Sequence, residues 1–261
     1  MKLDGFTQRK FAHDGYTLTV IERGDGPALI IMHELRGVTP EFLHFISEIA
    51  AAGFHVVSPI LYGSPGDSPG AVGTIFNVAR ICVSKEFAAL QAGQSGPITI
   101  WLRALAKDLQ SRSGNRGVGI LGMCFTGNFA LASLLEPAII AAVISQPSLP
   151  MGNSLEKRCD LHIEPAELQK IKARVAAEKI PLLTLRFSHD KLSPRERTER
   201  LQQEFGSALQ CIEIDSGPGN PHGIKVKAHS VLTRELVDKQ GHPTRDAYER
   251  VIKYFRERLL S

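Results

Sequence analysis

Residues 119–127 read Gly-Ile-Leu-Gly-Met-Cys-Phe-Thr-Gly, and this stretch decides the fold of the chain. It joins a short apolar run, typical of a strand buried on both faces, to a sequence that favours a helix. Cys124 stands at the junction, at the carboxyl end of the expected strand. Open parallel sheets bind their ligands at that end of the strands. The position therefore predicts a functional side chain in a sharp turn.

The same alternation of strand and helix patterns continues on both sides of this stretch. It predicts an α/β fold, with a mostly parallel central sheet and helices on both faces. No internal repeat or linker is visible, so we expect residues 1–261 to form a single domain, with a helical insertion around 152–180. The expected strands are 16–22, 28–33, 54–60, 117–123, 139–145, 181–187 and 209–214, and the expected helices are 40–52, 76–91, 97–112, 126–136 and 244–259, with a loop at 62–73.

The composition is that of an ordinary globular protein: 261 residues, 43% hydrophobic and 22% charged, with a net charge of +4. The basic residues are not clustered with aromatic ones, which argues against nucleic acid as a partner. No apolar run reaches the length of a membrane span or forms a signal peptide. Four cysteines without a CxxC pair predict no metal site and no cofactor. We expect a cytoplasmic monomer or homodimer with free thiols.

Cys124 is the predicted nucleophile. A residue in this turn points toward the start of the following helix, where backbone N–H groups and the helix dipole stabilise a thiolate. Gly122 fits the crowded turn of a Gly-x-Ser-x-Gly elbow, whereas Thr126 stands where that elbow has its second glycine. The competing interpretation is a buried, inert cysteine, which is the usual state of a free thiol.

A nucleophile needs a base, and the base needs a group that orients it. Asp190 follows the strand expected at 181–187, in the chain order nucleophile, acid, histidine. Two histidines after the last strand, His222 and His229, are both candidates for the base on this reasoning. Asp190 has a competing interpretation as a cap before Pro194.

At these residues the sequence resembles the dienelactone hydrolase family of α/β-hydrolases, over nearly the whole chain. The resemblance implies an α/β-hydrolase fold and a triad of Cys124, His229 and Asp190, because His229-Ser230 matches the family pattern and His222 does not. It rests on His33-Glu34-Leu35-Arg36-Gly37, Pro59-Ile60-Leu61-Tyr62, residues 122–127, Asp190, and His229-Ser230 before a long C-terminal helix.

The resemblance also implies the surroundings of the nucleophile. Glu34 would pair with the resting cysteine and shift when substrate binds, and the backbone N–H groups of Leu35 and Phe125 would form the oxyanion hole. The implied reaction is hydrolysis of a carboxylic ester or lactone through a thioester, without a cofactor. Arg36 and Arg80 are the candidates for binding an anionic substrate, since the arginine expected directly after the His-Ser pair is either missing or displaced to Arg234.

Two other functions stay open from the sequence. One is a different enzyme with a cysteine in such a turn, of the amidotransferase or deglycase kind, although those proteins lack the late Asp-then-His order. The other is an inactive scaffold that keeps the fold, since a fold alone does not give a function.

Overall fold

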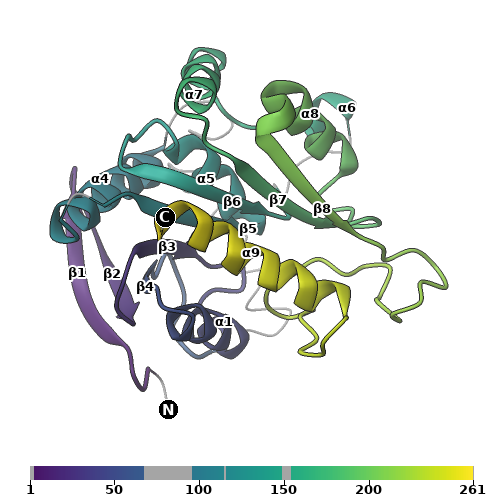
Figure 1. Cartoon of the computed structure of the whole chain (residues 1–261), viewed down its shortest axis with the longest axis horizontal. Helices are drawn as coiled ribbons and strands as arrows, with labels where there is room; N and C mark the ends of the chain where they lie inside the picture. Colours follow the sequence, from purple (N-terminus) through teal and green to yellow (C-terminus); the bar gives the residue numbers. More distant parts are fainter. Residues whose placement is uncertain (1–2, 68–95, 115, 149–153, 261) are drawn as a thin grey trace.

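The computed structural model describes residues 3–67, 96–114, 116–148 and 154–260. Eight strands within these ranges form one sheet in the order β1-β2-β4-β3-β5-β6-β7-β8 (Figure 1). The strands from β4 to β8 are parallel, and β1 and β2 add an antiparallel edge. The bounds are β1 (Thr7–His13), β2 (Tyr16–Arg23), β3 (Ala28–Met32), β4 (His55–Pro59), β5 (Val118–Met123), β6 (Ile139–Ser145), β7 (Leu182–Phe187) and β8 (Leu209–Ile214).

Helices cover both faces of the sheet, because strands such as β3 are apolar on both sides. Ile30 faces the core shared with α4 (Pro97–Arg112), and its neighbours Leu29 and Ile31 face the core shared with α1 (Pro40–Ala51). The α1 face also carries α9 (Pro243–Leu259), and the α4 face carries α5 (Gly127–Ser133), α7 (Pro165–Glu178) and α8 (Arg195–Phe205). This arrangement matches the predicted fold class.

The periodic elements lie where the sequence predicts them. The helix at 97–112 and the strands at 139–145 and 209–214 agree with the expected bounds. The expected helix at 76–91, and residues 68–73 of the expected loop, lie outside the described residues. None of the helices in the described ranges is long and apolar enough to cross a membrane.

Two elements were not predicted. β1 is an edge strand whose residues are mostly exposed on both sides, so it has no alternating pattern to recognise. α8 reads Arg-Glu-Arg-Thr-Glu-Arg-Leu-Gln-Gln-Glu-Phe, and its charged sequence hides a buried face that includes Arg197, Leu201 and Phe205. Both elements are held by tertiary contacts rather than by a strong local signal.

The region expected as a helical insertion contains two helices. α7 connects the neighbouring parallel strands β6 and β7, so it is the crossover helix that such a pair requires. The short helix α6 (Leu155–Cys159) is the additional part, and it packs against α8.

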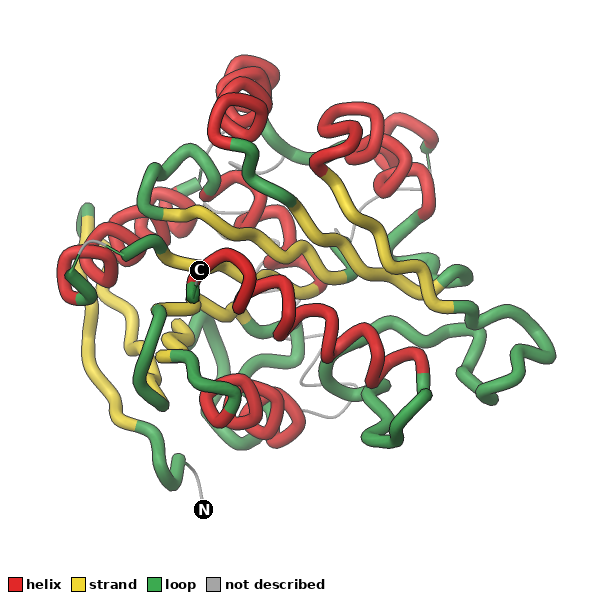
Figure 2. Tube along the Cα trace, in the orientation of Figure 1, coloured by secondary structure: helices red, strands yellow, loops and turns green. Residues whose placement is uncertain are grey.

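A long connection joins β8 to α9 and carries the chain across the edge of the sheet (Figure 2). Its first turn is organised by Asn220, whose amide bonds Gly217 O and Ile224 O and accepts from the Ile224 N–H. Further along, Ala228 is completely buried. The connection thereby anchors the backbone just before His229.

Candidate active site

Cys124 occupies a strained turn between β5 and the short helix η1 (Cys124–Thr126). Its φ of +58° is rare for a residue with a side chain, and such strain is a feature of nucleophile elbows. Gly122 makes the turn feasible, since a Cβ at that position would lie 2.1 Å from Thr126 O. The thiol is nearly buried, with Cys124 3% exposed.

Thr126 replaces the second glycine of the elbow without disturbing the turn. Its hydroxyl accepts from Met123 N at 2.9 Å and lies within hydrogen-bond distance of the Met123, Met32 and His33 carbonyls. The side chain is fully buried and therefore links the end of β5 to the end of β3. Thr126, where the elbow pattern has glycine, therefore forms structural hydrogen bonds in this chain.

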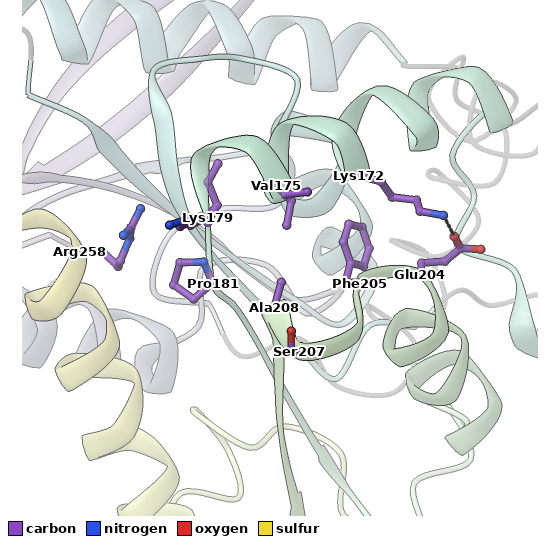
Figure 3. A pocket seen from close by; sticks show the side chains of 11 residues that line it. Lys172, Val175, Lys179, Pro181, Glu204, Phe205, Ser207, Ala208 and Arg258 are labelled. Carbon is purple, nitrogen blue, oxygen red and sulfur yellow. Dashed lines mark hydrogen bonds and ion pairs between the residues drawn. The ribbon is translucent and has the colours of Figure 1, made fainter.

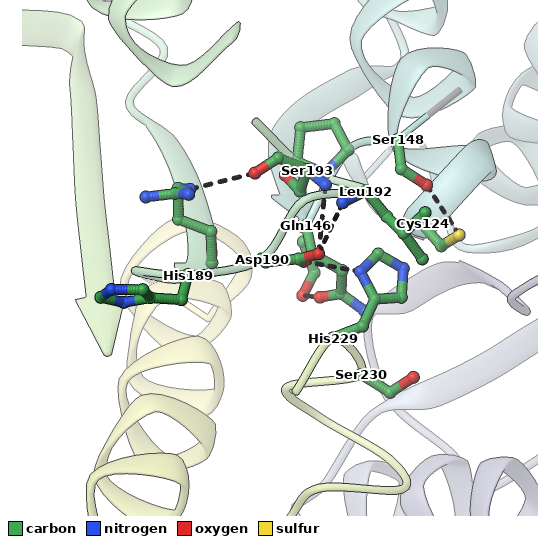
Figure 4. A network of polar contacts seen from close by, with 12 residues as sticks. Cys124, Gln146, Ser148, His189, Asp190, Leu192, Ser193, His229 and Ser230 are labelled. Atoms are coloured by element: carbon green, nitrogen blue, oxygen red, sulfur yellow. Dashed lines mark hydrogen bonds and ion pairs between the residues drawn. The ribbon is translucent and has the colours of Figure 1, made fainter. Parts of the chain in front are cut away.

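Asp190 and His229 come together at the carboxyl edge of the sheet, beside Cys124. Nδ1 of His229 donates to Asp190 Oδ2 at 2.6 Å. Figure 4 shows the imidazole between the Asp190 carboxylate and the Cys124 thiol. His222 lies elsewhere, with its ring 5.3 Å from that of His242. Of the two histidines left open by the residue pattern, His229 is therefore the one beside Asp190.

The remaining ring nitrogen of His229, Nε2, is buried and has no hydrogen-bond partner among the described residues. Burial alone would lower the pKa of His229. The adjacent Cys124 and the bond to Asp190 outweigh burial and hold this pKa well above its ordinary value. The imidazole is thus poised to hold a proton next to the thiol.

Glu34 does not contact Cys124 in this structure, in contrast to the pairing that the resemblance implies. Its carboxylate accepts hydrogen bonds from Gln146 Nε2 at 2.6 Å, Ser230 Oγ at 2.9 Å and Thr233 Oγ1 at 3.2 Å. These donors engage both carboxylate oxygens of Glu34. Burial raises the pKa of Glu34, although His229 and the three donors oppose the shift.

The loop after β3 is fixed through the carbonyl oxygen of Glu34. It accepts from Tyr62 Oη at 2.7 Å, His33 Nδ1 at 2.9 Å and Gly37 N at 2.9 Å. His33 is neutral, because burial lowers its pKa to about 4, and its Nε2 accepts from Leu61 N. In a trans peptide the N–H points opposite to the C=O. Anchoring this carbonyl therefore sets the direction of the Leu35 N–H.

Of the two predicted substrate-binding arginines, Arg36 lies within the described residues. Arg36 lines a small cavity of about 10 Å³ together with Glu34, Glu41 and Arg234. Arg234, the displaced family arginine, thus reaches the same place as Arg36. Arg80 lies outside the described residues.

Three residues of this site were missed by the sequence reasoning. Gln146 and Ser148 follow β6, and Ser148 Oγ lies 2.9 Å from Cys124 Sγ. Their place directly after a strand, at the carboxyl edge, was a usable signal. Arg197, on α8, donates to Pro147 O at 3.0 Å. It carried no signal, because a charged residue in a charged helix is expected at the surface.

A separate cavity of about 580 Å³ lies at the opposite ends of the strands, where β7 and β8 begin (Figure 3). Val175 and Phe205 on its floor are already buried, and Lys172 is paired with Glu204 at 2.6 Å. It contains none of the predicted site residues. Among the described residues, no group of three His, Cys, Asp or Glu is arranged to hold a metal ion.

The chain order of Cys124, Asp190 and His229, each placed beyond the carboxyl end of a strand, is that of the α/β-hydrolases. The predicted α/β-hydrolase fold is confirmed by solved structures of the same fold. The chain belongs to the dienelactone hydrolase family, whose model matches residues 14–259. Membership confirms the predicted enzyme class, a hydrolase acting on ester bonds. It argues against the amidotransferase or deglycase alternative.

The similar structures are distant in sequence. A proposed dienelactone hydrolase from Klebsiella pneumoniae subsp. pneumoniae is 16% identical with a TM-score of 0.61, and 97% of this chain and 98% of that chain are covered. The esterase Pf2001 from Pyrococcus furiosus is 13% identical with a TM-score of 0.59, covering 97% and 93%. The dienelactone hydrolase-like promiscuous phosphotriesterase P91 from metagenomic libraries is 14% identical with a TM-score of 0.59, covering 97% and 98%. No curated protein matches the chain.

Proposed function

We propose that this protein is a cysteine hydrolase that cleaves a carboxylic ester or lactone with Cys124, His229 and Asp190. The observation that carries the proposal is the pair of His229 and the buried carboxylate of Asp190, joined at 2.6 Å, beside a cysteine held at positive φ. Structural cysteines do not need a strained turn, and a lone histidine does not need a buried carboxylate. Together these features support the assignment of a nucleophile, a base and a group that orients the base.

The reaction begins with a proton transfer from Sγ of Cys124 to Nε2 of His229. The thiolate attacks the ester carbonyl carbon, a C–S bond forms, and the carbonyl electrons move to the oxygen. Backbone N–H groups of Leu35 and Phe125 stabilise this oxyanion. When the carbonyl re-forms, the C–O bond to the leaving group breaks, and the leaving oxygen takes the proton from His229.

Hydrolysis of the thioester completes the cycle. His229, now neutral, takes a proton from water as the water oxygen attacks the acyl carbon. Collapse of the second tetrahedral intermediate breaks the C–S bond and releases the carboxylic acid. The thiolate leaves beside the protonated imidazole, and return of the proton from Nε2 of His229 to Sγ restores the starting thiol. Asp190 keeps Nδ1 as the donor throughout, which leaves Nε2 facing the reaction.

The substrate is a small ester or lactone that can carry a negative charge. Arg36 and Arg234 lie around one small cavity beside Glu34 and Glu41, and their grouping supports them as the cationic contacts for a carboxylate on the substrate. Arg80 remains a proposed further contact. A thiolate is best suited to activated esters such as enol-lactones, whose leaving group departs without strong acid assistance. A reducing compartment such as the cytoplasm would keep the nucleophile reduced.

The proposal is tested with a panel of chromogenic esters and lactones, with and without a carboxylate. Cys124→Ala should abolish turnover, while Cys211→Ala, which alters an exposed residue on β8, should leave it unchanged. Turnover retained by Cys124→Ala would overturn the nucleophile assignment. A wild-type protein that turns over no substrate and whose Cys124 does not react with iodoacetamide would favour the inactive scaffold.

A further inference from the structure

Ser148 contacts the proposed nucleophile at two points. Its backbone N–H donates to Cys124 O at 3.1 Å, and its hydroxyl lies 2.9 Å from Cys124 Sγ. Ser148 is 4% exposed, so water does not compete effectively for these contacts. Figure 4 shows the Ser148 hydroxyl directed at the sulfur. Ser148 and His229 therefore both lie beside the thiol.

The backbone that carries Ser148 is anchored by Arg197. The guanidinium donates to Pro147 O at 3.0 Å, to Asp160 O at 2.9 Å and to Lys157 O at 3.1 Å. These acceptors are main-chain carbonyls from two separate segments, and Arg197 itself is 3% exposed. A planar group with several fixed donors suits this task, whereas a lysine amine does not. Arg197 thus fixes the residue just before Ser148.

Arg197 also brings a buried positive charge to this region. Its hydrogen bonds go to main-chain carbonyls, and no carboxylate within the described residues forms an ion pair with it, although arginine stays charged in proteins. Burial lowers the pKa of Arg197, and the nearby Asp160, Cys159 and Cys124 oppose that shift. Because the interaction between two groups is mutual, the Arg197 guanidinium would attract a thiolate at Cys124.

We propose that Ser148 and Arg197 stabilise the Cys124 thiolate: the Ser148 hydroxyl donates to the sulfur, and Arg197 fixes Ser148 and supplies a buried positive charge. The inference rests on Cys124 being the nucleophile, as proposed above. It gives Ser148 the role of resting partner that the family resemblance implies for Glu34. Ser148 contacts the reacting atom and is a catalytic residue in this scheme, while Arg197 is a positioning residue.

The physical reason lies in the difference between a thiol and a thiolate. A hydroxyl donates weakly to a neutral sulfur but forms a charge-assisted hydrogen bond with a thiolate. When the Cys124 proton moves to His229, the hydroxyl keeps its own proton and its bond to the sulfur strengthens. Glu34 does not take this role in the structure, because Gln146, Ser230 and Thr233 engage both of its carboxylate oxygens. His229 and Tyr62 also interact electrostatically with Cys124.

The test follows the alkylation of Cys124 by iodoacetamide over a pH series, read from the mass of the tryptic peptide that carries it. Ser148→Ala should move the midpoint of the rate profile up by about one pH unit and slow alkylation below it roughly tenfold. Ser133→Ala is the matched control, since the Ser133 hydroxyl is buried without a hydrogen-bond partner in the described structure. Its profile should equal that of the wild type. Ser148→Thr, which keeps a hydroxyl, should restore most of the rate.

Arg197 is tested by the same assay with two replacements. Arg197→Met removes the charge and should shift the profile in the same direction as Ser148→Ala. Arg197→Lys keeps the charge but not the three carbonyl bonds, and should shift it less. A Ser148→Ala profile that matches the wild type, even with a lower melting temperature, would overturn the inference and make Ser148 a packing residue.

Alkylation of Cys124 needs no substrate. The role of Ser148 and the proposed ester hydrolysis can therefore be refuted independently of each other. A protein without esterase activity but with a Ser148-dependent thiol would refute the function and keep the inference. An active esterase whose thiol does not depend on Ser148 would do the opposite.

Discussion

One carboxylate oxygen of Asp190 bonds His229, and the other accepts from backbone N–H groups of the turn that follows Asp190. Oδ2 lies 2.6 Å from Nδ1 of His229, while Oδ1 accepts from Leu192 N at 2.9 Å and Ser193 N at 3.3 Å. The turn after β7 and the orientation of the imidazole therefore depend on different atoms of one side chain. An amide at this position can keep the first function and lose the second.

Asp190→Asn should lower kcat for ester hydrolysis roughly 10³-fold or more, because an amide nitrogen facing Nδ1 selects the tautomer with the proton on Nε2. The turn should survive, since the amide oxygen still accepts from the two backbone N–H groups. Steady-state kinetics and the circular dichroism spectrum check both parts. Asp215→Asn alters a carboxylate after the next strand, bonded to Ser188 and Gly217, and should have wild-type kinetics. Full activity of Asp190→Asn would contradict the proposed triad.

Tyr62→Phe removes one of the donors to the carbonyl of Glu34. It keeps the aromatic ring packed against His33, with the two ring centroids 4.7 Å apart. We expect kcat to fall about tenfold with little change in KM, because a loosened Leu35 N–H weakens the transition state more than the bound substrate. Tyr16→Phe, in the hairpin at the far edge of the sheet, is the control. A rise in KM alone would show instead that Tyr62 binds substrate in its ground state.

Gly122→Ala should destabilise the protein severely, by roughly 3 kcal/mol or more, because its Cβ would meet the backbone at 2.1 Å. Gly127→Ala is the matched comparison. Its Cβ would lie 3.1 Å from Pro147 Cβ, a contact that a small shift relieves, so we expect a much smaller loss. Denaturant titration measures both variants. Equal stabilities would mean that the turn tolerates a side chain before the nucleophile.

Glu22 should make stability depend on acid pH. Burial alone would raise the pKa of Glu22, but the bonds from His55 and Arg9 lower it from 4.5 to about 2. A lowered folded pKa gives stabilisation that is complete above the unfolded value of 4.5 and is lost as the pH falls through about 2.

Glu22→Gln should therefore remove roughly 1–2 kcal/mol of unfolding free energy near neutral pH, after allowing for solvent screening. The difference from wild type should shrink between pH 4.5 and 2. Urea titrations at a series of pH values give the comparison. Glu199→Gln breaks an exposed helical ion pair and should change little at any pH. A difference in unfolding free energy between wild type and Glu22→Gln that stays constant down to acid pH would rule out the lowered pKa of Glu22.

The sequence predicts those elements of this protein whose conformation is determined by the residues next to them along the chain. Apolar runs such as 139–145 define their strands because both faces are covered, and the elbow at Cys124 is a local turn. β1 and α8 were invisible because their signal lies in contacts with distant segments. Asp190 was found from its place after a strand, and the resemblance then favoured His229 over His222.

The surroundings of Cys124 were harder to predict for a physical reason. Ser148, Gln146 and Arg197 act through hydrogen bonds between segments that are remote in sequence, and each is an unremarkable polar residue on its own. The position of Glu34 depends on three donors from two such segments, Gln146 after β6 and Ser230 and Thr233 before α9. A family pattern gives the identity of that carboxylate but not which donors hold it.

Thr126 has a mechanical consequence. Its hydroxyl connects the end of β5 to the carbonyls of Met32 and His33. The turn that carries the sulfur and the loop that carries the Leu35 amide are therefore held together by the same side chain. Heat or a bulky substrate would displace these two parts together, keeping the spacing between attacking atom and oxyanion donor constant. Adaptation to new substrates should then arise in the segments around this rigid unit, and patterns demanding glycine at this position would overlook enzymes built this way.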